Sequence, residues 1–289
     1  MKCTKATVRW IAVSVMFSMF VGMAPVAYGA EIENELPTEF EIGTEMEREP
    51  ETETESEAET EPELEQTLKG WQGNSYYINN EKVIGWKKIK GKHYYFDKKG
   101  NLVTNQIVYG KGETDTYYVD KTGVRVNDKV IKKAVKFVLR HTKKSWSREK
   151  KMKELFTYMV KEQKYQSFND PVSASKLPDY ASCVFDHDYG NCYRSATAYV
   201  YVATVLGYNA RLLAGKVSSR RSIPNAVHGW ADIKVGSNWK LCDISMQRPR
   251  PKTSLYMLKH SKYPFAHKFE KKYTICIENG KVTWKGEKL

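Results

Sequence analysis

Three side chains in the second half of this 289-residue chain belong to the types that perform nucleophilic acyl chemistry: Cys192, His228 and Asp243. A thiolate attacks a carbonyl carbon, an imidazole takes up and returns the proton, and a carboxylate orients the imidazole. Each residue alone has a structural explanation, because a single cysteine is often a small buried hydrophobe and a lone His or Asp in a strand is often a satisfied polar group. The chemistry therefore depends on the elements that position the three.

Cys192 stands at the start of a predicted helix that ends at Gly207. Gly190-Asn191 supplies a turn and a capping residue before it, and glycine is typical of a helix C-terminus. An apolar face recurs at Ala196, Tyr199, Val200 and Ala203. Unpaired N–H groups and the dipole at the helix start favour a thiolate, and the same N–H groups suit an oxyanion.

His228 and Asp243 fall on two predicted strands, 227–235 and 238–245, joined by a two-residue turn at Gly236-Ser237. In that register Trp230 lies opposite Asp243, and His228 is on the same face one diagonal away. A turn one residue longer would send the two side chains to opposite faces. The hairpin therefore predicts a His–Asp pair within side-chain reach.

These motifs resemble the transglutaminase-like branch of the papain-like thiol enzymes. The matching segments are Cys192 at a helix start, Leu206-Gly207-Tyr208-Asn209-Ala210-Arg211, His228-Gly229-Trp230, and Trp239-Lys240-Leu241-Cys242-Asp243. Ile244 replaces the Pro that usually follows the Asp. The resemblance implies an α+β fold in which Cys192 is the nucleophile, His228 the base and Asp243 the orienting residue.

The resembled family contains protein cross-linkers, peptidases, deamidases and inactive members, all sharing attack of a thiolate on an acyl group. We expect a protein or peptide substrate with a peptide or isopeptide bond, and hydrolysis is favoured over amine transfer. The open alternative is a non-catalytic wall-binding or adhesive protein that retains the scaffold. A second oxyanion donor is not assigned by the sequence.

The predicted catalytic domain covers residues 128–289. It opens with helices predicted over 130–140 and 148–163 and a loop predicted over 171–180. Cys242 and Cys276, both on predicted strands, are the one pair considered for a disulfide. No cofactor and no metal are expected. Cys183, His187 and Cys192 do not have the spacing of a zinc site. The domain from residue 128 onward has only 13 acidic residues, too few and too scattered for a good calcium site.

Residues 68–127 contain a recurring pattern of an aromatic doublet, an apolar residue, a small polar residue and a turn. The doublets are Tyr76-Tyr77, Tyr94-Tyr95 and Tyr117-Tyr118, and Gly-Trp precedes the first two, at Trp71 and Trp86. A spacing of about 20 residues with strand-like alternation predicts stacked β-hairpins in a short solenoid-like array.

This segment resembles the cell-wall-binding repeats of Gram-positive surface proteins, which include choline-binding modules. The resemblance implies a ligand site built from Trp71, Tyr77, Trp86, Tyr95 and Tyr118. Ser75, His93 and Thr116 stand where choline-binding repeats carry a second Trp. Wall carbohydrate or a teichoic-type polymer is therefore the expected partner rather than choline, and the alternative is that the tyrosines only pack the hairpins together.

The N-terminus predicts export. Residues 1–29 combine basic residues, an apolar run and a small-x-small pattern at Ala27-Tyr28-Gly29, as a signal peptide does. An uncleaved anchor is the alternative, and no transmembrane span is expected after cleavage. Residues 30–67 hold 16 Glu and predict a disordered linker or stalk. We therefore expect a secreted protein of the cell wall or cell surface.

The charge of the chain is uneven. From residue 68 onward there are 43 Lys and Arg against 18 Asp and Glu, a strong positive excess. Such an excess predicts attraction to polyanions. Outside a cell these are anionic wall polymers and lipid head groups, so nucleic acid is not an expected partner.

Overall fold

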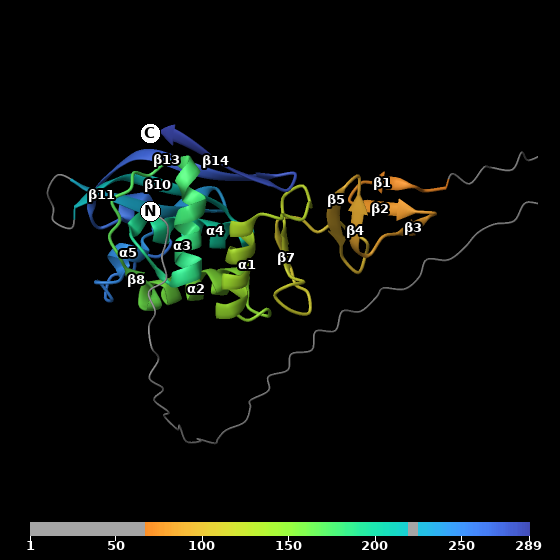
Figure 1. Cartoon of the computed structure of the whole chain (residues 1–289), viewed down its shortest axis with the longest axis horizontal. Coiled ribbons are helices and arrows are strands. Elements are labelled where there is room, and N and C mark those ends of the chain that lie inside the picture. The colour runs from red at the N-terminus through yellow and green to blue at the C-terminus, as the bar shows by residue number, and fades with distance from the viewer. Residues whose placement is uncertain (1–66, 219–224) are drawn as a thin grey trace, which may run out of the picture. The chain divides into compact units, whose positions relative to one another are not determined.

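The computed structural model describes residues 67–218 and 225–289 (Figure 1). The predicted signal peptide and almost the whole predicted linker lie outside the described residues, as do residues 219–224. In the described part, no helix is both long and apolar enough to cross a membrane.

The aromatic segment folds into short antiparallel strand pairs. The strands are β1 (Gly70–Gln72), β2 (Ser75–Ile78), β3 (Glu81–Lys82), β4 (Gly85–Ile89), β5 (Lys92–Phe96), β6 (Gln106–Val108) and β7 (Tyr117–Val119). β1, β2 and β3 form one sheet, β4 pairs with β5, and β6 pairs with β7. Lys90 and Gly91 both have positive φ, 46° and 80°, as a two-residue hairpin turn requires.

The third strand pair shares a hydrophobic core with the helices that follow it. Ile107, Tyr118 and Val126 are buried in the same cluster as the helical core. The Asp120 carboxylate, fully buried, accepts a hydrogen bond from the Gly280 backbone N–H at 2.7 Å. Residues 67–289 accordingly belong to one compact unit.

Two helices lie where the sequence predicts them. α1 (Lys129–His141) starts at Asp128, whose side chain accepts from two backbone N–H groups, and α2 (Arg148–Glu162) is capped by Ser147. α3 (Leu177–His187) follows a single 3₁₀ turn, η1 (Ala174–Lys176), and corrects the loop predicted over 171–180. Pro178 is compatible with the first turn of a helix, so it did not exclude one.

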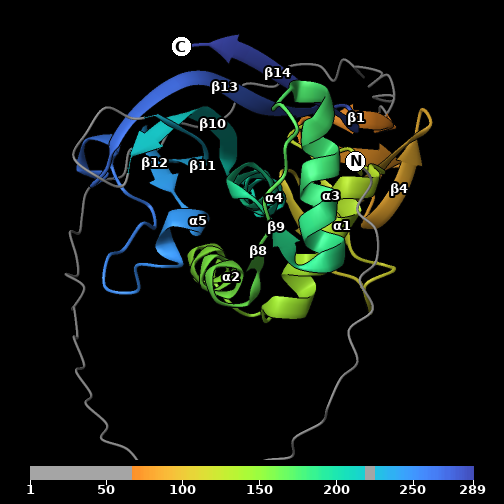
Figure 2. The same ribbon diagram turned by 60° about the vertical axis from the view of Figure 1, so that its left-hand side comes forward.

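The C-terminal half is built around α4 (Cys192–Val205) and a five-stranded antiparallel sheet. The strands are β10 (Asn209–Ser218), β11 (Ala226–Val235), β12 (Asn238–Cys242), β13 (Ala266–Glu278) and β14 (Lys281–Lys288), in the order β12-β11-β10-β13-β14. α4 is buried along its whole length and packs on β10 and β11. Figure 2 shows α1 to α4 gathered on one side of the sheet.

Four short elements lie near the start of α4 and the end of β12. β8 (Lys164–Tyr165) pairs in parallel with β9 (Tyr189–Gly190), directly before α4. α5 (Ile244–Gln247) follows β12, and η2 (His260–Lys262) precedes β13. The strand predicted to reach Ser245 ends at Cys242, because the Asp243 side chain accepts from the Met246 N–H and caps α5.

Candidate active site

Cys192 is the first residue of α4 and is 7% exposed. The preceding residue, Asn191, caps the helix: its side chain accepts from the Arg194 N–H and its carbonyl from the Ser195 N–H. The cap thereby leaves the N–H groups of Cys192 and Tyr193 at the helix start, where partial positive charge favours an anion.

Close packing of α4 on β11 requires a glycine beside the candidate base. A Cβ on Gly229 would meet the Tyr193 ring at 2.6 Å, a distance that real Cβ atoms do not show. Glycine between His228 and Trp230 therefore lets the start of α4 approach the strand. This is the physical reason for the His-Gly-Trp motif in this chain.

The β11–β12 hairpin has the predicted register. Val235 pairs with Asn238 across the turn, and the ladder continues to Ala231 opposite Cys242. His228 Nε2 lies 2.8 Å from Asp243 Oδ2, and both side chains are almost fully buried. The structure therefore brings together the His and Asp that the hairpin predicted.

The protonation of this pair follows from its surroundings. Burial alone would lower the pKa of His228, but the Asp243 carboxylate and the Cys192 thiol raise the pKa to about 10. Burial alone would raise the pKa of Asp243, but His228 and a hydrogen bond from Tyr263 lower it. With Nε2 donating to the carboxylate, Nδ1 is the nitrogen left to exchange a proton with Cys192.

Asp243 has further partners that sequence reasoning missed. The Tyr263 hydroxyl donates to Oδ2 at 2.6 Å, and the Met246 N–H and the Ser245 hydroxyl donate to Oδ1 at 3.0 and 3.2 Å. Trp230 packs edge-on against His228, with ring centroids 4.7 Å apart. The carboxylate and the imidazole are thus both fixed in orientation.

Tyr165 lies close to the start of α4 and was also missed by sequence reasoning. It pairs with Gly190, two residues before Cys192, across the β8–β9 ladder. Burial raises the pKa of Tyr165, and the charge of Cys192 raises it further, while Arg248 lowers it. Tyr165 is 54% exposed, so part of its side chain contacts solvent.

The remaining cysteines do not support the disulfide considered above. Cys242 and Cys276 are both free thiols, which corrects the Cys242–Cys276 pairing. Cys242 is buried on β12, and burial raises its pKa to about 12, so it is a poor nucleophile near neutral pH. Among the described residues, no group of three or more His, Cys, Asp or Glu side chains is placed to hold a metal ion.

The aromatic hairpins contain two ring clusters, each centred on a Trp, and the first also includes Phe96 at 5.7 Å from Trp71. In the first, Trp71 contacts Tyr76 and Tyr94 at centroid distances of 5.4 and 5.3 Å. Trp71 is 40% exposed. In the second, Trp86 contacts Tyr95 and Tyr117 at 5.2 and 5.7 Å. Both clusters join one hairpin to the next.

The second cluster contains a cation from the chain itself. The guanidinium of Arg125 lies 4.6 Å from the centroid of Tyr117 and 5.9 Å from that of Trp86. A cation over aromatic faces at this range is attracted by their quadrupoles. No Lys or Arg of the described residues lies over the rings of the first cluster.

The five ring residues predicted for wall binding thus have different surroundings. Trp71 lies in the first cluster, and Trp86 with Tyr95 in the second. Tyr77 is half-buried, 6.0 Å from the Lys82 ammonium. Tyr118 is 2% exposed and donates to Asn105 Oδ1 at 2.8 Å, so its ring packs in the core. The sequence pattern missed Tyr76, Tyr94 and Tyr117, because doublet residues alternate between faces.

Residues 135–244 match the family model described as the Transglutaminase-like superfamily. The match runs from α1 past Asp243 and includes Cys192 and His228. The chain therefore contains a transglutaminase-like domain of mixed helix and sheet, as the motif resemblance predicts for this segment. No curated protein matches the chain.

Among solved structures, a putative cysteine protease from Cytophaga hutchinsonii is 14% identical, with 53% of this chain and 50% of that chain covered and a TM-score of 0.32. A structure described as a TGase is 17% identical, with 46% and 35% covered and a TM-score of 0.33. The choline binding domain of Spr1274 in Streptococcus pneumoniae is 26% identical, with 18% and 77% covered and a TM-score of 0.17. The chain thus spans half or less of the first two proteins, and the TM-scores are too low to carry an argument about substrate or ligand.

Proposed function

We propose that this chain is a secreted, cell-surface cysteine acyl-transfer enzyme that cleaves or transfers amide bonds of proteins or wall peptides. The observation that carries the proposal is the His228 Nε2 to Asp243 Oδ2 contact of 2.8 Å, with Cys192 in contact with the same imidazole. A metal-free thiol, imidazole and carboxylate in this arrangement are sufficient for attack on an amide.

The first half of the reaction forms a thioester. Cys192 Sγ gives its proton to His228 Nδ1 and attacks the carbonyl carbon of the amide. The carbonyl oxygen becomes an oxyanion, which the N–H groups of Cys192 and Tyr193 are placed to stabilise. The tetrahedral species collapses, the C–N bond breaks, and the proton on His228 passes to the leaving amine.

The second half resolves the thioester. Water gives a proton to His228 and attacks the acyl carbon, which releases a carboxylic acid and the thiol. A primary amine in place of water forms a new amide, which is transfer rather than hydrolysis. We favour hydrolysis. We assign Tyr165 as the second oxyanion donor, in addition to the N–H groups at the helix start, because it pairs with Gly190, two residues before Cys192, and the charge of Cys192 acts on its hydroxyl.

Location at the wall is part of the proposal. The predicted signal peptide directs export, and the aromatic hairpins with their positive excess hold the enzyme at an anionic wall polymer. Supporting observations are the exposed ring of Trp71 and the two ring clusters. Retention at the wall would raise the local concentration of peptide substrates attached to it.

A peptide library with glutamine-containing and isopeptide-linked members tests the catalytic assignment. Wild-type protein is incubated in ¹⁸O water, with and without a primary amine, and products are identified by mass spectrometry. We expect ¹⁸O-labelled acids from wild type and none from Cys192→Ala. The matched control is Cys276→Ala, which removes another free thiol and should retain full activity.

Three outcomes would contradict parts of the proposal. Equal turnover by Cys192→Ala and wild type would remove Cys192 as the nucleophile. Amine-linked products without any ¹⁸O-labelled acid would replace hydrolysis with transfer. An active-site thiol probe that fails to label Cys192 in the folded protein would favour the non-catalytic wall-binding alternative.

A further inference from the structure

A cavity of about 430 Å³ lies where the third strand pair meets the far end of α4. It is lined by Asn105 and Lys121 from the aromatic segment, by Thr204 and Asn209 around the end of α4, and by Lys234 and Trp239 from the sheet. α4 has 14 residues, so the cavity is about 20 Å from the helix start that carries Cys192. The cavity is separate from the acyl chemistry.

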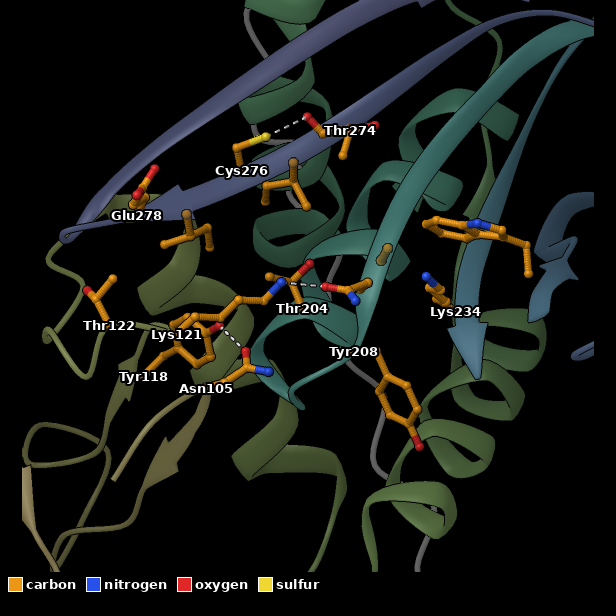
Figure 3. A pocket seen from close by; sticks show the side chains of 15 residues that line it. Asn105, Tyr118, Lys121, Thr122, Thr204, Tyr208, Lys234, Thr274, Cys276 and Glu278 are labelled. Atoms are coloured by element: carbon orange, nitrogen blue, oxygen red, sulfur yellow. Dashed lines mark hydrogen bonds between the residues drawn. The ribbon is translucent and has the colours of Figure 1, made fainter. Parts of the chain in front are cut away.

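Three neighbouring strands place a row of side chains along this cavity. Trp239 on β12 pairs with Lys234 on β11, and Lys234 pairs with Asn209 on β10. Directly opposed residues of antiparallel strands point to the same face, so the three side chains lie side by side. Figure 3 shows Lys121 approaching from the aromatic segment and Lys234 from the sheet.

The charged side chains that line the cavity are mostly cationic, with Lys121 and Lys234 against Glu278. Lys121 Nζ donates to Asn209 Oδ1 at 2.6 Å, and the ammonium keeps two further N–H groups. Lys234 is half-buried and forms no ion pair with any described residue. Glu278 is the one acidic side chain among the lining residues, and it is exposed. A surplus of positive charge requires a ligand with negative charge.

One local effect opposes the binding of an anion in this cavity. The C-terminal end of α4 carries partial negative charge. Asn105 Nδ2 donates to the Gly207 carbonyl at 3.0 Å and thereby satisfies one exposed acceptor at this end. The two ammonium groups together exceed the exposed Glu278 carboxylate and the half-charge of the helix end, so the net charge around the cavity remains positive.

Trp239 adds a fixed aromatic surface to the row. The Arg211 guanidinium lies 3.8 Å from the centroid of its ring, and Arg211 is held by the buried Asp232 carboxylate at 2.8 Å. The indole is therefore held from one side. Aromatic rings combine apolar area with little conformational entropy, which suits packing against the C–H face of a sugar ring.

We propose that this cavity binds an anionic, hydroxyl-rich saccharide segment, with its acidic group between Lys121 and Lys234 and a sugar ring against Trp239. The proposal extends the wall retention of the proposed function and does not depend on catalysis by Cys192. Residues from the aromatic segment and from the sheet both contact the ligand, so binding fixes the two parts of the chain to one polymer strand.

Isothermal titration of the full chain with soluble polymers tests this site. The probes are a polymer of sugar units joined by phosphodiesters, polygalacturonate, neutral dextran and inorganic polyphosphate. We expect both charged saccharide polymers to bind, and the double variant Lys121→Gln/Lys234→Gln to raise their Kd about tenfold, which corresponds to about 0.7 kcal/mol for each lysine. The charged polymer that binds more tightly identifies the preferred acidic group as a phosphodiester or a carboxylate.

The matched control is Lys98→Gln/Lys99→Gln, which removes the same charge from an exposed turn of the aromatic segment. An equal rise in Kd in this control would overturn the proposal, because non-specific attraction between the basic protein and the anionic polymer would then explain binding. Trp239→Ala should weaken saccharide polymers about tenfold while leaving polyphosphate unchanged. Equal binding of dextran and the charged polymers would also overturn it.

A readout at Cys192 keeps this result separate from the proposed enzyme activity. Labelling of Cys192 by a thiol probe should be unchanged in Lys121→Gln/Lys234→Gln. Failure of the catalytic assignment in Cys192→Ala would leave the polymer titration unaffected.

Discussion

The candidate active site and the aromatic hairpins hold their side chains by different forces. Asp243 is fully buried and accepts hydrogen bonds from His228, Tyr263, Ser245 and the Met246 backbone. In the hairpins, Trp71 and Trp86 are oriented by edge-to-face contacts with other rings. Directional hydrogen bonds define one geometry, whereas ring contacts tolerate several arrangements.

The difference separates what each region is suited to do. Acyl chemistry requires reacting groups held within a few tenths of an ångström, which buried and fully paired polar groups provide. A polymer ligand is bound by the sum of many weak contacts, which half-exposed rings and lysines provide. Single substitutions in the triad should therefore change kcat strongly, whereas single substitutions in the hairpins should change ligand affinity only slightly.

The largest effect is expected from Asp243→Asn. The amide can no longer stabilise the imidazolium or fix Nε2–H, so kcat should fall about a thousandfold with KM little changed. Steady-state kinetics on a peptide found in the library screen measures this. The matched control is Asp232→Asn on β11, an equally buried carboxylate bound by Arg211 and His260.

Asp232→Asn should lower the thermal midpoint as Asp243→Asn does, because both leave buried donors unpaired. It should retain the kcat of wild type. Equal losses of kcat in the two variants would mean that the loss reflects folding rather than the triad.

The next effect is expected from Tyr165→Phe. Loss of one oxyanion donor lowers kcat by about tenfold to a hundredfold, and KM stays within about twofold because the donor acts on the transition state. Tyr189→Phe is the control, since it removes a phenol from the strand paired with Tyr165. Unchanged kcat in Tyr165→Phe would assign the second donor elsewhere.

A smaller effect is expected from Tyr263→Phe, which removes one hydrogen-bond donor to the Asp243 carboxylate. The hydrogen bond from Tyr263 lowers the pKa of Asp243, so its loss raises that pKa. A carboxylate with a lowered pKa stabilises the fold above its unfolded value of 3.8 and loses this contribution as pH falls. The acid-unfolding midpoint should therefore move to higher pH.

In the same variant kcat should fall about tenfold, because the carboxylate is less firmly oriented. The control is Tyr180→Phe, whose hydroxyl donates to the Pro171 carbonyl at 3.0 Å and touches no member of the triad. An unchanged acid midpoint and unchanged kcat in Tyr263→Phe would show that this hydroxyl has no positioning role.

The His228–Asp243 pair could be predicted from the sequence because β11 and β12 are consecutive strands joined by a short turn. A two-residue turn at Gly236-Ser237 fixes the register, and the register fixes which side chains share a face. The start of α4 was likewise predicted from Asn191 and Gly207, which act within a few residues of the helix ends. Local rules were sufficient to place Cys192 at a helix start and His228 beside Asp243.

Sequence reasoning missed what depends on distant segments. Tyr263 reaches Asp243 from a segment 20 residues further along the chain, and no spacing rule connects the two. Tyr165 comes next to Cys192 through a parallel ladder of only two residue pairs. The cavity beside Trp239 and Lys234 requires the third strand pair to meet the end of the sheet, which no local pattern specifies.

The smallest effect, and the sharpest test of the hairpins, is expected from Arg125→Ala. The guanidinium of Arg125 lies 4.6 Å from the Tyr117 ring and occupies the second ring cluster. A cation–π contact of about 1 kcal/mol corresponds to about fivefold in affinity, so removal of Arg125 should let tetramethylammonium bind there about fivefold more tightly. Tryptophan fluorescence titration measures this. Arg125→Lys keeps the cation and should bind like wild type, and Arg125→Ala/Trp86→Ala should lose the gain. If wild type and Arg125→Ala bound tetramethylammonium with equal affinity, the side chain of Arg125 would not be what keeps cations out of the second cluster. The two clusters would then resemble each other only in how their rings pack.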